Sequence, residues 1–283
     1  MEYQTMKTNA IVLKEKELGE TDKIFTLYTK NFGKFEVMGK GIRKIKAKLK
    51  FGLQGLNNVS LEFIRGKNFF IATDVFLKNG FWSLKREIRK YRAGLYVCDI
   101  TDRLITGEEK DEEIWDLLFE TLERIDILPS VNYQLSMAVR YFEWNLLSFL
   151  GFEPELYHCI ICQNKLSGGE FYFSAKEGGI VCNKCQMSSR AKRRKAEDKA
   201  GSHRSLNADL NESEAGREIK TNYLSSAKCQ KISRDAIKIL RLIILKDKNT
   251  LKRLKINPVQ ERELKDLSKY YLSWILEEEN FVI

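Results

Sequence analysis

Four cysteines in two C-x-x-C pairs, Cys159-Ile-Ile-Cys162 and Cys182-Asn-Lys-Cys185, are the residues of this chain with the clearest capacity for chemistry. Two thiolates in a C-x-x-C pair can reach one metal ion, and the 19 residues between the pairs are typical of tetrahedral zinc sites. Because all four ligands would come from the protein, water would hold no coordination position. The pattern therefore predicts one Zn²⁺ ion with a structural role.

The segment between the two pairs has a pattern that would bring them together. Glu170–Ser174 and Ile180-Val181 are apolar enough for short strands, and Gly178-Gly179 is a natural turn between them. Such a hairpin returns the second pair beside the first. We therefore expect a zinc ribbon at about residues 157–187.

Other interpretations of the cysteines are a redox motif, disulfides or buried apolar thiols. A redox motif needs one C-x-x-C at the start of a helix, and no charged-then-apolar secretion signal follows Met1, which makes disulfides a weaker expectation. Cys98 and Cys229 stand apart and are interpreted as isolated thiols. His158 adjoins the first pair, and packing beside the site is favoured over a role as ligand.

The first 80 residues have the pattern of a small β-barrel. Five short apolar or alternating segments are separated by turn residues: Ala10–Leu13, Ile24–Thr29, Lys34–Met38, Val59–Ile64 and Phe69 to about Leu77. An OB-fold is the simplest prediction, although the pattern does not distinguish it from an SH3-like barrel.

A basic loop follows the third expected strand. Residues 40–50 hold six cations and no acid, and phosphates would relieve the repulsion among them. Together with the preceding strand, the loop supplies the predicted nucleic-acid-binding residues: Lys34, Lys40, Arg43, Lys44, Lys46 and Lys48. Aromatic rings that could stack on bases are Phe35, Phe51, Phe63 and Phe69, but core burial is favoured for each. A solvated, mobile loop is the alternative.

Helical periodicity begins after the barrel. Helices are expected at Leu84–Ile105, from Asp111 to before Pro129, at Ser130–Leu150, at Ser233–Leu245 and at Asn257–Glu278. Residues 188–229 lack apolar periodicity and are predicted to be a disordered insertion, whose basic start either adds nonspecific grip on nucleic acid or is a solvated linker. The prediction is thus an α+β multidomain protein: an OB-fold nucleic-acid-binding domain at 1–80 and a helical domain at 81–283 with the zinc ribbon inserted.

Charge and composition narrow the function classes. The formal net charge is +10, and it is unevenly spread: residues 1–80 hold 15 basic and 8 acidic side chains, whereas residues 81–158 hold 9 and 15. The basic charge of residues 1–80 favours a polyanionic partner, and the acidic charge of residues 81–158 favours binding to other proteins. No apolar run approaches the roughly 20 residues of a membrane span, so we expect a cytoplasmic protein. No phosphate-binding loop or catalytic triad was found, and enzyme activity is not expected.

Several segments, in order along nearly the whole chain, resemble the RecO family of DNA repair proteins. They are Ala10–Leu13, Gly19-Glu-Thr-Asp22-Lys-Ile24, Tyr28–Lys34, Lys40-Gly-Ile-Arg43-Lys44, Leu150–Pro154 before the first cysteine pair, and Gly178–Cys185. Residues 188–229 look like an addition to the usual family length.

The resemblance implies an amino-terminal OB-fold, a helical domain with a zinc module, and a non-catalytic role as recombination mediator. Such proteins bind single- and double-stranded DNA, anneal strands, and act with RecR to load RecA onto strands coated by single-strand-binding protein, which implies association with the nucleoid. In this family the tail of single-strand-binding protein docks on the helical domain, and Arg140 is the residue expected to meet it; ordinary exposure on a helix is the alternative. Lys85, Arg86, Arg89 and Lys90 either extend the DNA track or form a solvated helix face.

Two other functions remain open. One is an OB-fold and zinc-ribbon accessory factor that binds RNA. The other is a protein adaptor whose basic surface is incidental.

Overall fold

The computed structural model describes residues 4–44, 48–129, 133–188, 229–246, 250 and 253–277. Its contacts divide the chain into two compact units. The first is Met1–Leu150 with Ile256–Glu261 and Val282–Ile283, and the second is Gly151–Lys255 with Arg262–Phe281. The expected domain boundary at residue 80 stays a prediction, since β-barrel and following helices share the first unit.

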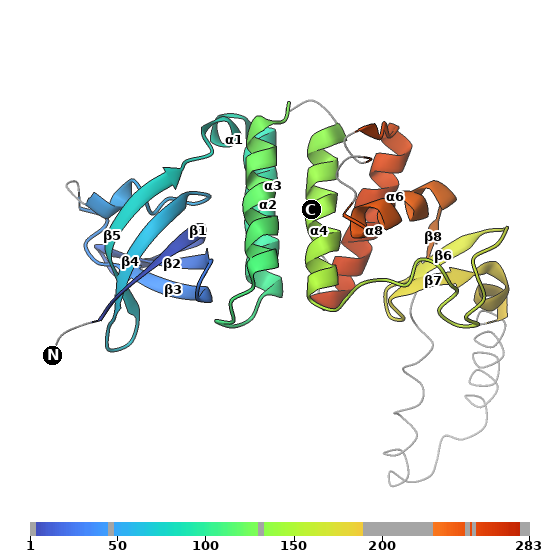
Figure 1. The fold of residues 1–283 in the computed structure, drawn as a ribbon, viewed down its shortest axis with the longest axis horizontal. Coiled ribbons are helices and arrows are strands. Elements are labelled where there is room, and N and C mark those ends of the chain that lie inside the picture. The colour runs from blue at the N-terminus through green and yellow to red at the C-terminus, as the bar shows by residue number, and fades with distance from the viewer. Residues whose placement is uncertain are drawn as a thin grey trace, which may run out of the picture. The chain divides into compact units, whose positions relative to one another are not determined.

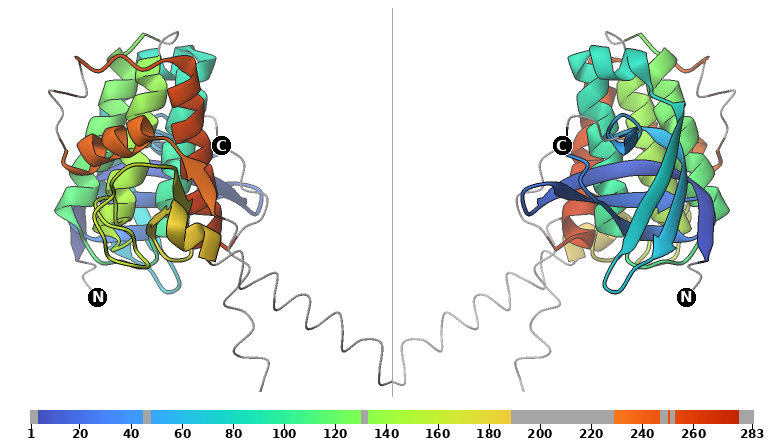
Figure 2. Two further views of the ribbon diagram at one scale, coloured as in Figure 1. Left: turned by 90° about the vertical axis from the view of Figure 1, so that its right-hand side faces the viewer. Right: turned by 90° about the vertical axis from the view of Figure 1, so that its left-hand side faces the viewer.

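The first unit begins with a closed five-stranded barrel (Figures 1 and 2). Its strands are β1 (Thr5–Leu18), β2 (Asp22–Thr29), β3 (Gly33–Gly39), β4 (Asn58–Arg65) and β5 (Phe70–Asn79). Their order is β1-β2-β3-β5-β4, and β4 closes the barrel on β1. The β3–β5 pair is parallel and every other pair is antiparallel. This order is that of the OB-fold, which confirms the prediction.

The alternating sequence of the strands explains why the barrel closes. Alternate apolar side chains such as Ala10 and Val12, Phe25 and Leu27 enter one buried cluster. The long strand β1 pairs with β4 through its first half and with β2 through its second half. Its register with β2 shifts between Val12 and Lys14, where the strand bends away from β4 and continues along β2.

Helices complete the first unit: α1 (Trp82–Arg86), α2 (Ile88–Leu104), α3 (Glu112–Ile127) and α4 (Tyr133–Phe149). The single helix expected at Leu84–Ile105 is wrong, because extended backbone at Glu87 separates α1 from α2. Asp111 caps α3 by accepting a hydrogen bond from the Ile114 N–H. Helices α2, α3 and α4 pack against one another through apolar faces.

The second unit is built around a small antiparallel sheet of order β7-β6-β8. The predicted hairpin is present as β6 (Phe171–Ser174) and β7 (Gly179–Cys182), and β8 (Gln230–Ile232) adds to the far side of β6. Helix α6 (Arg234–Ile244) follows β8 and is capped by Ser233. Helix α8 (Pro258–Ile275) begins after its N-cap Asn257 and brings Tyr271 to within 5.2 Å of the Phe173 ring, centroid to centroid.

Most of the predicted insertion, residues 189–228, lies outside the described residues, as does the expected start of the third helix at 130–132. Among the helices that the structure describes, none combines the length and apolarity needed to cross a membrane.

Candidate metal centre and nucleic-acid interface

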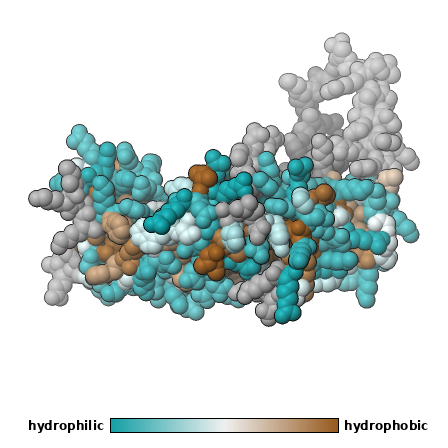
Figure 3. Space-filling view, turned by 90° about the horizontal axis from the view of Figure 1, so that it is seen from above, coloured by the Kyte–Doolittle hydropathy of each residue, from teal (hydrophilic) through white to brown (hydrophobic). Residues whose placement is uncertain are grey.

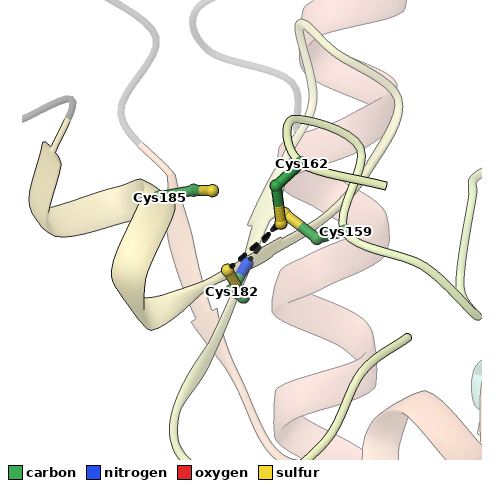
Figure 4. A group of neighbouring side chains, drawn as sticks. All are labelled: Cys159, Cys162, Cys182 and Cys185. Carbon is green, nitrogen blue, oxygen red and sulfur yellow. Dashed lines mark hydrogen bonds between the residues drawn. The ribbon is translucent and has the colours of Figure 1, made fainter. Parts of the chain in front are cut away.

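The four predicted ligand cysteines converge in the second unit (Figure 4). Their sulfur atoms all lie within 4.8 Å of one another. Cys159 and Cys162 come from the loop before the hairpin, Cys182 ends β7, and Cys185 lies in the first turn of the helical segment 183–188. A soft donor set of four sulfurs at this spacing can hold one tetrahedral metal ion.

Backbone geometry shapes the first pair into a tight turn. The Gln163 N–H donates to the Cys159 carbonyl at 2.8 Å, and the Cys159 N–H donates to the Asn164 carbonyl at 2.9 Å. Gln163 takes a left-handed conformation with φ of 60°. The turn thus points both sulfurs to the same side, at the cost of backbone strain in a residue with a side chain.

Hydrogen bonds also favour a thiolate in the cluster. Burial raises the pKa of Cys159, but N–H donors from Cys182, Cys162 and Ile161 outweigh it and lower the pKa to about 6. The Cys182 N–H lies 3.4 Å from the Cys159 sulfur. Burial and hydrogen bonds from the neighbouring sulfurs raise the pKa of Cys185. The hydrogen bonds thus favour a thiolate at Cys159, and a divalent metal would favour deprotonation of the others.

His158 and Cys229 lie beside the four converging cysteines. His158 is 40% exposed and its Nδ1 lies 3.7 Å from Glu155, so it sits beside the site as favoured. Cys229, which the sequence suggested to be an isolated thiol, packs against the apolar cluster around Cys159 and Tyr172. It is nonetheless not one of the four cysteines whose sulfurs converge.

The start of the basic loop is a defined turn at residues 40–44. The Asp22 carboxylate accepts the Gly41 N–H at 2.7 Å, and the Arg43 N–H donates to the Thr21 carbonyl at 3.0 Å. The hydrogen bonds from the Gly41 N–H and the Thr21 hydroxyl lower the pKa of Asp22, and the charges of Lys40 and Lys44 add to the effect. Lys40, Arg43 and Lys44 are exposed. Two separate sequence segments thus meet, with Asp22 positioning a turn that presents three cations.

The other predicted DNA-binding lysines are placed differently. Lys34 donates to the backbone carbonyl of Asp102 at 2.5 Å and lies 3.3 Å from its carboxylate, and its side chain is only 17% exposed. Its charge is therefore already neutralised within the first unit. Lys48 begins a short 3₁₀ helix, η1 (Lys48–Lys50), and Lys46 lies outside the described residues.

The candidate aromatic residues separate into two classes. Phe35 and Phe63 are buried in the barrel core, as favoured, with ring centroids 5.0 Å apart. Phe51 and Phe69 are exposed, at 58% and 36%, so the favoured core burial is wrong for these two. Only the exposed rings are accessible to a base.

The cations of α1 and α2 do not form one track. Arg86 and Arg89 are exposed, but Lys90 is 3% exposed and donates to Ser83 and to the Asp126 carbonyl. Lys90 therefore stabilises the helices, and its buried side chain belongs neither to a DNA-binding track nor to a solvated helix face. Lys85 donates to the Asn57 side chain, and burial lowers its pKa.

Both roles expected for Arg140 require an exposed side chain, but Arg140 is buried. It is 3% exposed in α4, with its Nε 2.9 Å from Glu143, which in turn accepts a hydrogen bond from Tyr96 at 2.5 Å. This burial gives no support to a contact between Arg140 and a partner's tail, which stays a prediction. Burial of this kind has no local sequence signal, since Arg140 stands in an ordinary amphipathic pattern.

A groove of about 630 Å³ lies where the barrel meets α1 and α2. Its cations are Lys23, Arg43, Lys50 and Lys85, and its acids are Glu15 and Glu17. The acids pair with two of the cations, as Lys23–Glu15 at 2.7 Å and Arg43–Glu17 at 3.3 Å. Among the described residues no acid pairs with Lys50 or Lys85, so the groove keeps positive charge.

Comparison with known proteins places this architecture in a family. Two family models match: "Recombination protein O N terminal" over residues 1–79 and "Recombination protein O C terminal" over residues 85–212. The chain is 23% identical over 276 residues to the DNA repair protein RecO of Alkaliphilus metalliredigens, covering 98% of this chain and 96% of that protein.

Two further relatives give the same result. The chain is 31% identical to the DNA repair protein RecO of Dehalococcoides mccartyi strain 195 over 64% of this chain and 70% of that protein. It is 28% identical to that of strain CBDB1 over 84% and 87%. With its barrel, its helices and its four-cysteine cluster, the chain belongs to the RecO family of DNA repair proteins.

Proposed function

We propose that this protein is a recombination mediator that binds and anneals single-stranded DNA. The observation that carries the proposal is the turn at residues 40–44, which Asp22 holds on an OB-type barrel with three cations exposed. Phosphates of either single- or double-stranded DNA would neutralise this turn without sequence preference, and released counterions would favour binding.

Annealing follows from the same contacts. Two complementary strands repel each other through their phosphates, and a protein that neutralises both lowers that barrier. Lys40, Arg43 and Lys44 are the residues proposed to act, with Lys46 and Lys48 continuing the basic loop. Lys34 contributes instead to the attachment of the barrel to α2. No covalent step is needed, so the proposed role is non-catalytic.

The proposed partners follow from family membership and charge. Acting with RecR, the protein would load RecA onto strands coated by single-strand-binding protein. The acidic residues of 81–158 repel DNA and are assigned to protein contacts. The proposed cofactor is one structural Zn²⁺ held by Cys159, Cys162, Cys182 and Cys185, whose sulfurs already converge.

The experiment that tests this function is annealing of complementary DNA strands coated with the cognate single-strand-binding protein. We expect faster annealing when the protein is added, and the gain should shrink as salt rises. A folded, zinc-loaded protein that leaves the rate unchanged would contradict the mediator function. Tighter binding to folded RNA than to single-stranded DNA would favour an RNA accessory factor.

A further inference from the structure

Two aromatic rings are exposed beside the positively charged groove at the barrel–helix junction. Phe51 is 58% exposed and Trp82 is 49% exposed, and their ring centroids lie 6.0 Å apart with an interplanar angle of 35°. Phe51 directly follows η1, and Trp82 is the first residue of α1, at the point where the chain leaves β5 (Figure 1). Residues 31 apart in sequence thus form one exposed apolar surface.

The backbone before Trp82 is strained in a way that produces this exposure. Phe81 has φ of 43° and is fully buried, whereas its neighbour Trp82 points outward. A bulky residue rarely adopts a left-handed conformation, and such strain persists where the surroundings require it. The Phe81 N–H donates to the Asn79 side chain at 2.9 Å, which holds the bend.

Gly80 packs against the indole ring of Trp82. A Cβ placed on Gly80 would lie 2.7 Å from Trp82 Cε2 and 2.8 Å from Cζ2, closer than carbon atoms approach. The ring therefore packs directly on the Gly80 backbone, which restricts its rotation. The indole is in this way a positioned surface and not a freely moving side chain.

Cations flank the pair. The Lys85 ammonium lies 5.8 Å from the centroid of the Trp82 ring, and Lys50 precedes Phe51 in the chain. Both lysines line the groove, and they are the two that no acid neutralises among the residues described there. A strand whose base reaches the rings would place its phosphates near these ammonium groups.

We propose that Phe51 and Trp82 form a stacking site for an unpaired DNA base, with Lys50 and Lys85 binding the adjacent phosphates. The site rests on the proposed function, and it adds a preference that the turn at 40–44 lacks. Phosphate contacts accept either form of DNA, whereas a base within a duplex is already stacked and its faces are not accessible. The rings would therefore favour single strands over duplex.

On the face of the molecule seen in Figure 3, exposed apolar surface is limited. Hydrophobic side chains appear there as separate small patches within a mainly hydrophilic surface. A protein partner held by hydrophobic contact would need a larger continuous apolar area. A single base needs only a ring or two with charge nearby.

The test compares Phe51→Ala and Trp82→Ala with Phe76→Ala in the full-length protein. Phe76 is a fair control because it is 54% exposed on β5 and has Lys7 5.8 Å from its ring centroid. Affinity for oligo(dT), a duplex of equal length and an abasic strand is measured at one salt concentration, with melting curves to verify folding. We expect each stacking variant to lose about tenfold in affinity for oligo(dT) and little for duplex. Phe76→Ala should bind as the parent does.

Two further measurements make the result specific. Trp82→Phe keeps a ring and should recover most of the lost affinity. The abasic strand should bind the parent and the Phe51→Ala variant equally, because it offers no base to stack.

Each contrary outcome has a distinct meaning. If the parent binds DNA and the folded Ala variants bind oligo(dT) equally well, the stacking site is refuted while the proposed function stands. Equal losses on oligo(dT) and duplex also refute it. If the parent binds no DNA, the proposed function fails and the stacking site fails with it.

Discussion

Asp102 on α2 links two strands of the barrel to the helices. It is 12% exposed and accepts hydrogen bonds from Lys14 of β1 and Lys34 of β3. We expect Asp102→Asn to destabilise the first unit by about 1–3 kcal/mol, because a charge-assisted contact is lost and the partly buried Lys34 keeps an unpaired charge. The measurement is chemical denaturation at neutral pH. Lys14→Ala is the control and should cost less than about 1 kcal/mol, since Lys14 is 58% exposed.

The pKa of Asp102 also predicts how its contribution to stability changes at low pH. Burial raises the pKa of Asp102, but the hydrogen bond from Lys14 and the charge of Lys34 outweigh it and hold the pKa below its ordinary value of 3.8. Its contribution is therefore complete above that value and is lost as pH falls through the lower folded-state pKa. The stability difference between the parent and Asp102→Asn should be constant from pH 7 to about 5 and should shrink below about 4. A difference that grows in acid would contradict this.

Single residues show where sequence reasoning succeeds. The four cysteines could be predicted as one cluster because each pair is held by local chain geometry and the hairpin between them has its own turn and strand signals. Lys34 and Lys90 could not be assigned, because their partners Asp102 and Asp126 are 68 and 36 residues away in sequence. A cation in a sequence does not reveal whether an acid already neutralises it.

At the scale of elements, the end of the β2–β3 hairpin packs closely against the loop before α3. A Cβ on Gly33 would lie 2.4 Å from the Glu109 carbonyl oxygen and 2.6 Å from the Glu108 carbonyl carbon, and Gly33 has φ of 64°. Gly33→Ala should therefore lower the free energy of unfolding by roughly 2–4 kcal/mol, from strain in φ and displacement of the loop.

A matched glycine separates these two causes. Gly19 has φ of 61°, and a Cβ there meets no atom within 4 Å. Gly19→Ala should cost only the strain of the left-handed conformation, about 1 kcal/mol. Equal costs for the two variants, measured by thermal or chemical denaturation, would mean that the contact with the loop contributes nothing.

The elements that the sequence did not reveal are the ones set by tertiary pairing. The five barrel strands and most helices were predicted because their apolar periods extend over several residues. Strand β8 is three residues long, and residues 175–229 separate it from its partner β6, so neither its length nor its neighbours in sequence indicate it. The break at Glu87 has no glycine or proline to mark it, and only the extended backbone there separates α1 from α2.

At the scale of the whole molecule, the four cysteines belong to the second unit alone. Metal binding stabilises folding where the folded state alone assembles the ligands. We therefore expect Cys159→Ser or a strong chelator to unfold the second unit and leave DNA binding by the barrel in place. Zinc content per chain and the number of thermal transitions are the measurements.

Cys229→Ser is the control for this prediction. Cys229 packs in the same apolar cluster but lies outside the convergent four, so this variant should keep one zinc per chain. If the parent as purified contains no zinc and Cys159→Ser melts as the parent does, the prediction of structural zinc is wrong.

The basic turn at residues 40–44 leads to a prediction about how DNA binding depends on salt concentration. If the turn at 40–44 binds phosphates, each contact contributes about 0.7 to the slope of log affinity against log salt for single strands. Replacing Lys40, Arg43 and Lys44 together by alanine should lower the slope by about 2 and weaken binding to all sequences alike. Replacing Lys7, Lys67 and Lys78, which are exposed elsewhere on the barrel, removes the same net charge and should change the slope little. Equal changes in the two triple variants would show that net charge alone attracts DNA, because a defined turn would then have no advantage over any other part of the basic surface.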